Sequence, residues 1–284
     1  MRFILILFFL AFSLAQAQLD DPEHRNYLRD SVCFKLKFNQ GDTLVYQVIS
    51  YDSIVVDYGT ALLKSRTEKI QIICDSVSSD GAFFLSHTLI DFKSKEAERV
   101  FDDNAIERNK HEWVGKTVHL KIDSLGNRLS ETPYQSKEAI QSPGGGFQPY
   151  LFFAFRESCK SVGESWLVDG TDELVENANP PAMLSYSALF RARDEIDTLG
   201  YQCNAFEYVK TGQGAIEAIH NKQLVKVSNV INSFGILYID KEIFKPVHYY
   251  YTVEQKLKFH LEDNEEIPVQ HFVTANFTLL EFRR

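Results

Sequence analysis

Apolar and polar residues alternate along several stretches of the chain, which is the pattern of a strand with one buried face. Residues Phe34–Phe38 and Val118–Ile122 show this alternation most regularly. Three further apolar stretches predict strands at Leu44–Ser50, Glu68–Asp75 and Ala82–Ile90. The first half of the chain therefore predicts a series of short antiparallel strands.

Turn residues separate these strands. Asp80-Gly81 lies between two of them, and Asp-Gly is a preferred dipeptide of the type I′ hairpin turn, in which both central residues have positive φ. The sequence Ser124–Asn127 predicts another turn. The spacing of Ala97, Val100 and Phe101 instead predicts one helix over residues Ser94–Asp102.

The second half ends in long alternating stretches. Tyr249, Tyr251 and Val253 are predicted to share one strand face, and Val269–Phe282 contains no glycine or proline and predicts an ordered final strand. The 22 Phe and 13 Tyr residues of the 284-residue chain fit strands better than helices. We expect a mostly β protein with minor α structure, its antiparallel curved sheet or sheets forming either a duplicated β-meander or a half-barrel.

Three landmarks recur in the same order in the two halves. Gly41-Asp42, Gly81 and Leu120–Asp123 in the first half correspond to Gly163-Glu164, Gly200 and Leu237–Asp240 in the second. This order favours an internal duplication, although chance similarity of strand-turn-strand sequences remains an alternative. We expect one globular unit divided into a signal peptide (1–17), a first half (18–135), a glycine- and aromatic-rich linker (136–160) and a second half (161–284).

The first residues have the features of a secretory signal. Arg2 precedes the apolar run Phe3–Leu14, and Ala15-Gln16-Ala17 matches a signal-peptidase site. The run is shorter than the roughly 20 residues of a membrane span. A lipid anchor would need a cysteine directly after the signal, whereas the nearest is Cys33. We expect an exported protein, periplasmic or extracellular and soluble, that begins at Gln18.

The formal net charge is −9, which argues against nucleic acid as a partner and against binding to anionic membrane surfaces. We expect neither a cofactor nor a metal. None of the 8 histidines forms a recognised metal-binding spacing; His260 and His271 flank an acidic stretch that predicts a hairpin loop.

Catalytic motifs are incomplete. The segment Gly163–Leu167 contains only the first half of a nucleophile elbow, and Gly144–Gly146 lacks the lysine and hydroxyl residue of a phosphate-binding loop. An enzyme is therefore not expected, and a hydrolase of unrecognised type is kept as an alternative.

The 4 cysteines are an even set in a chain expected to be exported, which favours disulfides over free thiols. Three pairings are possible for four cysteines. Cys33 and Cys159 each precede the opening strand of one half, and Cys74 and Cys203 lie on corresponding hairpins. The preferred pairing is therefore Cys33–Cys159 and Cys74–Cys203.

The linker holds the strongest candidate for a binding site. Gly144–Gly146 is followed by an aromatic segment that could close over an apolar groove, as mobile segments near binding sites often do. The alternative is that this segment packs as core between the two halves. The candidate ligand-binding residues are Phe147, Tyr150, Phe152, Phe153 and Phe155.

The Gly-Asp and Gly-Glu strand openers, the Asp-Gly hairpin and the segment Gly163-Glu164-Ser165-Trp166 resemble those of exported β-rich proteins without an assigned function. Over Cys33–Phe282 their expected architecture is similar to the half-barrels of periplasmic lipoprotein carriers. The resemblance implies a curved sheet around helices, with a concave apolar face that holds acyl chains. This chain is longer and lacks clear helical lids, so no binding residue is carried over.

Three functions follow from these observations. The first is a non-enzymatic binding or carrier protein of the cell envelope for an apolar small molecule or lipid. The second is a structural or interaction module without a ligand cavity, whose protein partner the sequence does not identify. The third is the unrecognised hydrolase.

Overall fold

The computed structural model describes residues 31–98, 105–111, 114–127, 129, 159–175, 182–220, 223–261 and 265–284. In these ranges the protein is all-β and contains no helix. The strands are β1 (Ser31–Cys33), β2 (Thr43–Val56), β3 (Leu62–Val77), β4 (Phe83–Ala97), β5 (Ile106–Arg108), β6 (Thr117–Ile122), β7 (Cys159–Ser161), β8 (Ser165–Val175), β9 (Ala182–Thr198), β10 (Tyr201–His220), β11 (Gln223–Asp240), β12 (Pro246–His260) and β13 (Glu266–Arg283).

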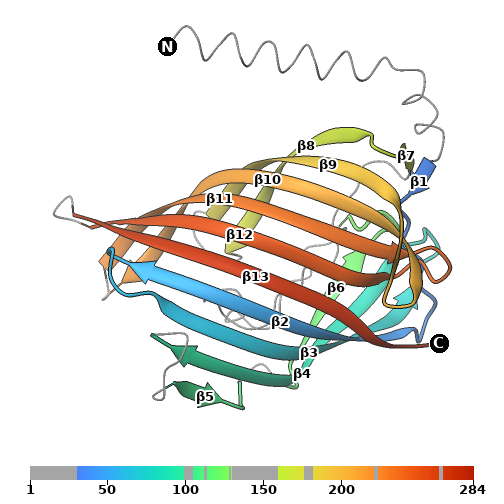
Figure 1. Cartoon of the computed structure of the whole chain (residues 1–284), viewed down its shortest axis with the longest axis horizontal. Coiled ribbons are helices and arrows are strands. Elements are labelled where there is room, and N and C mark those ends of the chain that lie inside the picture. The colour runs from blue at the N-terminus through green and yellow to red at the C-terminus, as the bar shows by residue number, and fades with distance from the viewer. Residues whose placement is uncertain are drawn as a thin grey trace, which may run out of the picture.

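One antiparallel sheet of 11 strands dominates the molecule (Figure 1). Its order is β5-β4-β3-β2-β13-β12-β11-β10-β9-β8. The eleventh strand, β6, also pairs with β4. Among the described residues, the sheet curves without pairing its two edges to each other. The mostly β, antiparallel and curved fold predicted from the sequence is confirmed.

Strand β13 joins the two halves of the chain. It pairs with β12 on one side and with β2 on the other, from Val269 opposite Val56 to Arg283 opposite Thr43. The two predicted halves are therefore parts of one sheet.

Both halves open with the same backbone arrangement: Gly41 and Asp42 form backbone hydrogen bonds with Cys74, and Gly163 and Glu164 form them with Ala192. The duplication itself stays a prediction.

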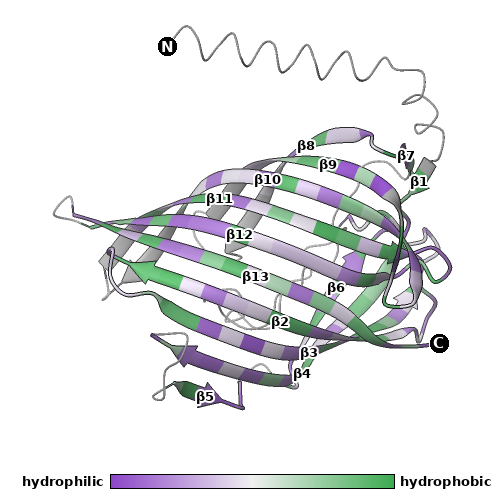
Figure 2. Ribbon diagram, in the orientation of Figure 1, coloured by the Kyte–Doolittle hydropathy of each residue, from purple (hydrophilic) through white to green (hydrophobic). Residues whose placement is uncertain are grey.

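Buried side chains gather on one face of this sheet, which we call the inner face. In β2, for example, Leu44, Tyr46 and Val48 are at most 4 % exposed, while the residues between them are partly exposed. Figure 2 shows the resulting mixture of hydrophobic and hydrophilic residues along the long strands. The alternation that predicted these strands is therefore the alternation between the inner and the outer face.

The segment Phe34–Phe38 is not a regular strand, so that prediction was wrong. Its predicted alternating burial is present, because Phe34, Leu36 and Phe38 are buried and the two lysines between them are exposed. Its backbone bonds to turns instead of a strand, with the Leu36 amide donating to the Ser124 carbonyl at 2.8 Å. The segment contributes apolar side chains to the core without joining a ladder.

The helix predicted over Ser94–Asp102 was also wrong, because β4 continues to Ala97. Neighbouring strands determine the outcome: Ser94 pairs with Arg66 of β3 and with Arg108 of β5. Ladder hydrogen bonds on both sides outweigh a weak local helical pattern. Residues 99–104 lie outside the described ranges.

The turn at Asp80-Gly81 is present, but its type was predicted wrongly. Gly81 has φ 82°, whereas Asp80 is not among the residues with positive φ, so type I′ geometry is excluded. Two residues with positive φ occur together at Leu199-Gly200, with φ of 54° and 81°, in the tight connection between β9 and β10.

One of the two predicted disulfides is confirmed. Cys33 and Cys159 are bonded and connect β1 to β7, which form a separate two-stranded sheet. Cys74 and Cys203 are free and buried, so their predicted pairing was wrong. Strands β3 and β10 are separated in the sheet by β2, β13, β12 and β11. At about 4.8 Å per strand step, this separation far exceeds the reach of a disulfide.

The predicted signal peptide and most of the predicted linker, residues 136–158, lie outside the described residues. In the part of the chain that the structure describes, no helix is long and apolar enough to cross a membrane.

Candidate functional site on the inner face

The five aromatic residues predicted to bind a ligand, Phe147, Tyr150, Phe152, Phe153 and Phe155, lie outside the described residues. Their role stays a prediction. The described residues instead place a different group of side chains on the inner face of the sheet, and this group forms the candidate site.

An aromatic cluster occupies the middle of the inner face. The ring centroids of Tyr249 and Tyr251 are 5.1 Å apart, and that of Phe277 lies 5.5 Å from the first and 6.0 Å from the second. The hydroxyl oxygens of Tyr208 and Tyr249 are 2.9 Å apart in a buried hydrogen bond. The cluster thus presents apolar ring faces with hydroxyl groups among them.

A glycine makes room for this cluster. A Cβ atom on Gly235 would lie 2.3 Å from the ring of Tyr208, the residue directly opposite on β10. The tyrosine ring therefore covers the backbone of β11, an arrangement in which an aromatic side chain compensates for a glycine in a strand. Tyr186 lies over Gly170 in the same way.

Further along the strands the inner face changes from apolar to polar while its burial continues. In β2 the inward positions after Val48 are Ser50 and Asp52, which are 4 % and 3 % exposed. Neighbouring strands change in the same region, so the buried polar residues form a continuous group. We call this group the polar belt; its members are Ser50, Asp52, Arg66, Glu68, Ser94 and His271.

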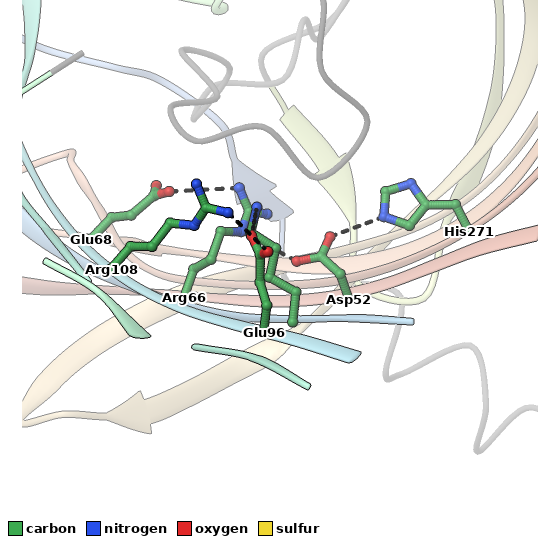
Figure 3. A network of polar contacts seen from close by, with 7 residues as sticks. Asp52, Arg66, Glu68, Glu96, Arg108 and His271 are labelled. Atoms are coloured by element: carbon green, nitrogen blue, oxygen red, sulfur yellow. Dashed lines mark hydrogen bonds and ion pairs between the residues drawn. The ribbon is translucent and has the colours of Figure 1, made fainter. Parts of the chain in front are cut away.

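Asp52 is the centre of the polar belt (Figure 3). One carboxylate oxygen, Oδ1, lies 3.0 Å from His271 Nε2, and the other, Oδ2, lies 3.2 Å from Arg66 Nε. The guanidinium of Arg66 also faces Glu68, with Nη1 3.6 Å from Oε1. A single aspartate thus connects β13 to β3 across β2, and a partner on each side compensates its buried charge.

The belt becomes more solvent-exposed toward the sheet edge. Glu96 forms ion pairs with Lys64 at 3.1 Å and with Arg108 at 3.5 Å. Arg108 belongs to the edge strand β5, and its side chain is 58 % exposed. These outer pairs are screened by water, unlike the pairs around Asp52.

Tyr251 lies where the aromatic cluster meets the polar belt. Burial raises the pKa of its hydroxyl well above the ordinary value of 10.0; Arg66 opposes this rise, and the carboxylates of Asp52 and Glu68 add to it. Tyr251 therefore stays a neutral phenol over the physiological range. It supplies an uncharged polar group at the border between the two parts of the face.

Several buried polar atoms of the inner face have no hydrogen-bond partner within the described part of the chain. They are His271 Nδ1, Ser94 Oγ and both side-chain atoms, Oδ1 and Nδ2, of Asn229. His271 and Ser94 are 4 % and 6 % exposed, and Asn229 is only 1 % exposed. A buried polar atom without a partner destabilises a fold by about 1–3 kcal/mol, so such atoms commonly indicate a site where a ligand or water binds.

Sequence reasoning missed the polar belt. The sequence pattern marks His271 only as a residue beside an acidic loop, and it does not single out Asp52, Arg66 or Glu68. The spacing of residues in β2 could have indicated the belt. Asp52 follows Leu44, Tyr46 and Val48 at even spacing, and alternate residues of a strand point to the same face, so Asp52 points inward. A charged residue in phase with apolar ones suggests a buried charge that needs a partner.

Asp75 and His119 line a pocket of about 320 Å³ formed by β3, β4 and β6, and Ser86 contacts both of them. Ser86 Oγ donates to Asp75 Oδ2 at 2.5 Å and lies 3.0 Å from His119 Nδ1. In a hydrolase triad the carboxylate orients the histidine and leaves the serine proton to that histidine. Here Asp75 holds the serine directly, which does not match that arrangement.

No group of three or more histidine, cysteine or acidic side chains in the described ranges is arranged to hold a metal ion.

No protein-family profile matches the chain, and no curated protein matches it. One solved structure, titled "Asymmetric conductivity of engineered proteins", is 9% identical over 82% of this chain and 99% of its own length, with a TM-score of 0.20. A likeness at this level supports no conclusion about fold or function.

Proposed function

We propose that this protein is an exported, non-enzymatic binding or carrier protein for a ligand with a long apolar part. The ligand lies against the inner face, with its apolar part on the aromatic cluster and its polar group at the polar belt. Export into a periplasmic or extracellular space is supported by the signal-like first seventeen residues and by the disulfide between Cys33 and Cys159.

One observation carries this proposal: buried, unpartnered polar atoms lie on the same face as a large aromatic cluster. A purely structural sheet would be more stable with apolar side chains at these positions. Small-molecule sites, by contrast, combine an apolar lining with a few polar groups that fix orientation. The inner face has this composition in the described residues of β2, β3, β11, β12 and β13.

The dimensions also fit an elongated ligand. Along β13 the inward side chains run from Phe277 through Ala275 and Val273 to His271. At about 3.3 Å per residue, the stretch of β13 from Phe277 in the aromatic cluster to His271 in the polar belt is roughly 20 Å long. Its small side chains Ala275 and Val273 leave an apolar connection between the two parts of the face.

Binding is tested with N-phenyl-1-naphthylamine, an uncharged probe that fluoresces in apolar surroundings. Purified protein with an intact disulfide should bind it at micromolar concentration, and a long-chain alcohol should displace it. Native mass spectrometry of protein isolated from its own host should show a bound apolar molecule. If the probe does not bind and the isolated protein carries no such molecule, the protein is better explained as an interaction module of the envelope.

A further inference from the structure

We propose that Asn229 recognises the polar group of the ligand, and that this group is an uncharged primary amide or lactam. Such groups present an N–H donor and a carbonyl acceptor side by side. This inference rests on the proposed binding function and names the ligand class of the same site. It follows from the neighbours of Asn229 on the inner face and from its two unpartnered side-chain atoms.

Asn229 points to the inner face from β11. It is 1 % exposed and alternates in phase with Leu237 and Val227, which are also buried. Gly235, in the same phase, lies opposite Tyr251 of the aromatic cluster. From Gly235 to Asn229 the strand runs six residues, which is roughly 20 Å at about 3.3 Å per residue. A long apolar chain on the cluster can therefore extend to Asn229.

The position of Asn229 is also close to the polar belt. Ile231, the next inward residue of β11, lies opposite Gln255 of β12, and Gln255 lies opposite His271 of β13. Asn229 is thus one inward position farther from the aromatic cluster than the row of His271. The polar group that the proposed function places at this end of the face can reach it.

The four nearest positions on the inner face offer Asn229 no hydrogen-bond partner. Gly214 and Leu257 lie directly opposite on β10 and β12. Val227 and Ile231 are its neighbours on the same face of β11. None of these four side chains has a polar atom, and within the described residues both Oδ1 and Nδ2 of Asn229 are buried without a partner. A partner therefore has to come from outside the sheet, where the ligand lies.

These neighbours also favour an uncharged group. Leu257 and Val227 form a buried apolar cluster with Val269. A charge desolvated among apolar side chains needs a partner of opposite charge, and the neutral amide of Asn229 does not supply one. Gln255, diagonally opposite on β12, is a neutral amide as well. The group that fits beside Asn229 is therefore neutral.

Two unpartnered atoms define the ligand more narrowly than one. Oδ1 of Asn229 accepts hydrogen bonds and Nδ2 donates them, so a group that satisfies both needs a donor and an acceptor next to each other. This requirement is the same whichever of the two positions carries the oxygen. A primary amide meets it with two parallel hydrogen bonds. A ketone or a carboxylate cannot donate, and a protonated amine cannot accept.

The test compares four ligands with the same long aliphatic chain: the primary amide, the methyl ketone, the amine and the carboxylate. The ketone is the closest match, because a methyl group replaces the NH₂ of the amide. Each ligand displaces N-phenyl-1-naphthylamine from the intact protein at a pH of about 8, where the amine and the carboxylate are both charged. We expect the amide to displace the probe at lower concentrations than the other three. Equal or tighter binding of any of them overturns the inference.

Asn229→Leu should remove the preference, because leucine has the branched shape of asparagine without its polar atoms. The concentration of ketone needed, divided by that of amide, should fall about ten-fold relative to the wild type, which is the effect of one net hydrogen bond. Probe binding should persist. An unchanged ratio contradicts the inference. Asn232→Leu is the matched control, because it is the same substitution at an exposed position of the same strand, and it should keep the wild-type ratio.

Asn229→Ala replaces this variant if Asn229→Leu does not fold, and the same fall in the ratio is expected. Probe binding without a preference for the amide in the wild type refutes the inference and leaves the binding function standing. Failure of the probe and of all four ligands to bind refutes the binding function itself.

Discussion

The ammonium of Lys245 lies 2.9 Å from Asp42 Oδ2, and both side chains are only 2% exposed. The same ammonium is 4.1 Å from the ring centroid of Phe38. This buried ion pair connects the turn between β11 and β12 to the turn that opens the first half. Asp42 Oδ2 also accepts from the backbone N–H of Asn39 at 2.9 Å, so two donors compensate its charge.

We predict that removing one partner of this pair is strongly destabilising. Lys245→Ala or Asp42→Ala should lower the free energy of unfolding by about 3–5 kcal/mol, because each leaves a buried charge without its partner. The double substitution Asp42→Ala with Lys245→Ala should lose less than the sum of the two single losses, because neither charge is then left buried without its partner. Urea unfolding of all four proteins measures the coupling.

The control for this prediction is the exposed pair Lys256–Glu254, at 3.0 Å with side chains 52% and 45% exposed. Lys256→Ala should change the free energy of unfolding by less than about 1 kcal/mol. If Lys245→Ala has an equally small effect, the ion pair with Asp42 does not stabilise the fold.

His87 should make the fold sensitive to acid. Burial lowers its pKa from 6.5 to about 3, so the unfolded chain takes up a proton at a pH where the folded protein does not. Stability is therefore lost as the pH falls from about 6.5 toward about 3, by up to about 1.4 kcal/mol per pH unit from this residue. Urea unfolding at about pH 7, 6 and 5 measures the slope.

Other groups also titrate in acid, so the comparison for His87 is the variant His87→Leu. Its free energy of unfolding should fall less steeply over the same range. Parallel pH profiles for the two proteins would show that His87 does not carry the effect.

Asn229→Leu should increase stability while weakening binding. Asn229 lies opposite Leu257, which forms a small separate apolar cluster with Val227 and Val269. Replacing its unpartnered amide should raise the free energy of unfolding by about 1–3 kcal/mol. If the amide serves the ligand, the affinity for the long-chain alcohol should fall several-fold.

Asn232→Leu is the matched control for Asn229, because Asn232 is exposed and accepts from the Thr211 hydroxyl at 3.0 Å. It should neither stabilise the fold nor change binding. A loss of stability in Asn229→Leu would show that the amide has a partner within the protein.

Leu199 occupies a backbone conformation that suits asparagine better. Leu199 has a φ of 54° and precedes Gly200 in the two-residue connection between β9 and β10. A leucine side chain is strained in this left-handed conformation. Leu199→Asn should raise the free energy of unfolding by about 1 kcal/mol. Leu167→Asn is the contrasting control, because Leu167 is 61% exposed on the extended strand β8, where asparagine should be slightly destabilising.

Local alternation predicted parts of β2, β3, β4, β6, β12 and β13, because an inner and an outer face impose the same period on each of them. It did not predict β9, β10 or most of β11. It did not predict that β4 extends to Ala97, because the hydrogen bonds that extend this strand come from β3 and β5. It could not identify the pairing of β13 with β2, which depends on residues far apart in the chain.

The polar belt was hidden from sequence reasoning for a related reason. Asp52 and His271 are 219 residues apart, and nothing local to either residue indicates the other. A polar residue in an alternating stretch is normally assigned to the outer face. The spacing within β2 could place Asp52 on the inner face, but only the register of β2, β3 and β13 shows that Arg66 and His271 lie beside it.

The position of β13 has a consequence for the order of assembly. During synthesis β2 and β12 are both made before the strand that lies between them. Until β13 is available, each presents an unpaired edge, and such edges promote association with other chains. Contacts of this long sequence separation also form slowly. The nascent chain should therefore depend on a chaperone to keep β2 and β12 apart from other chains until β13 inserts.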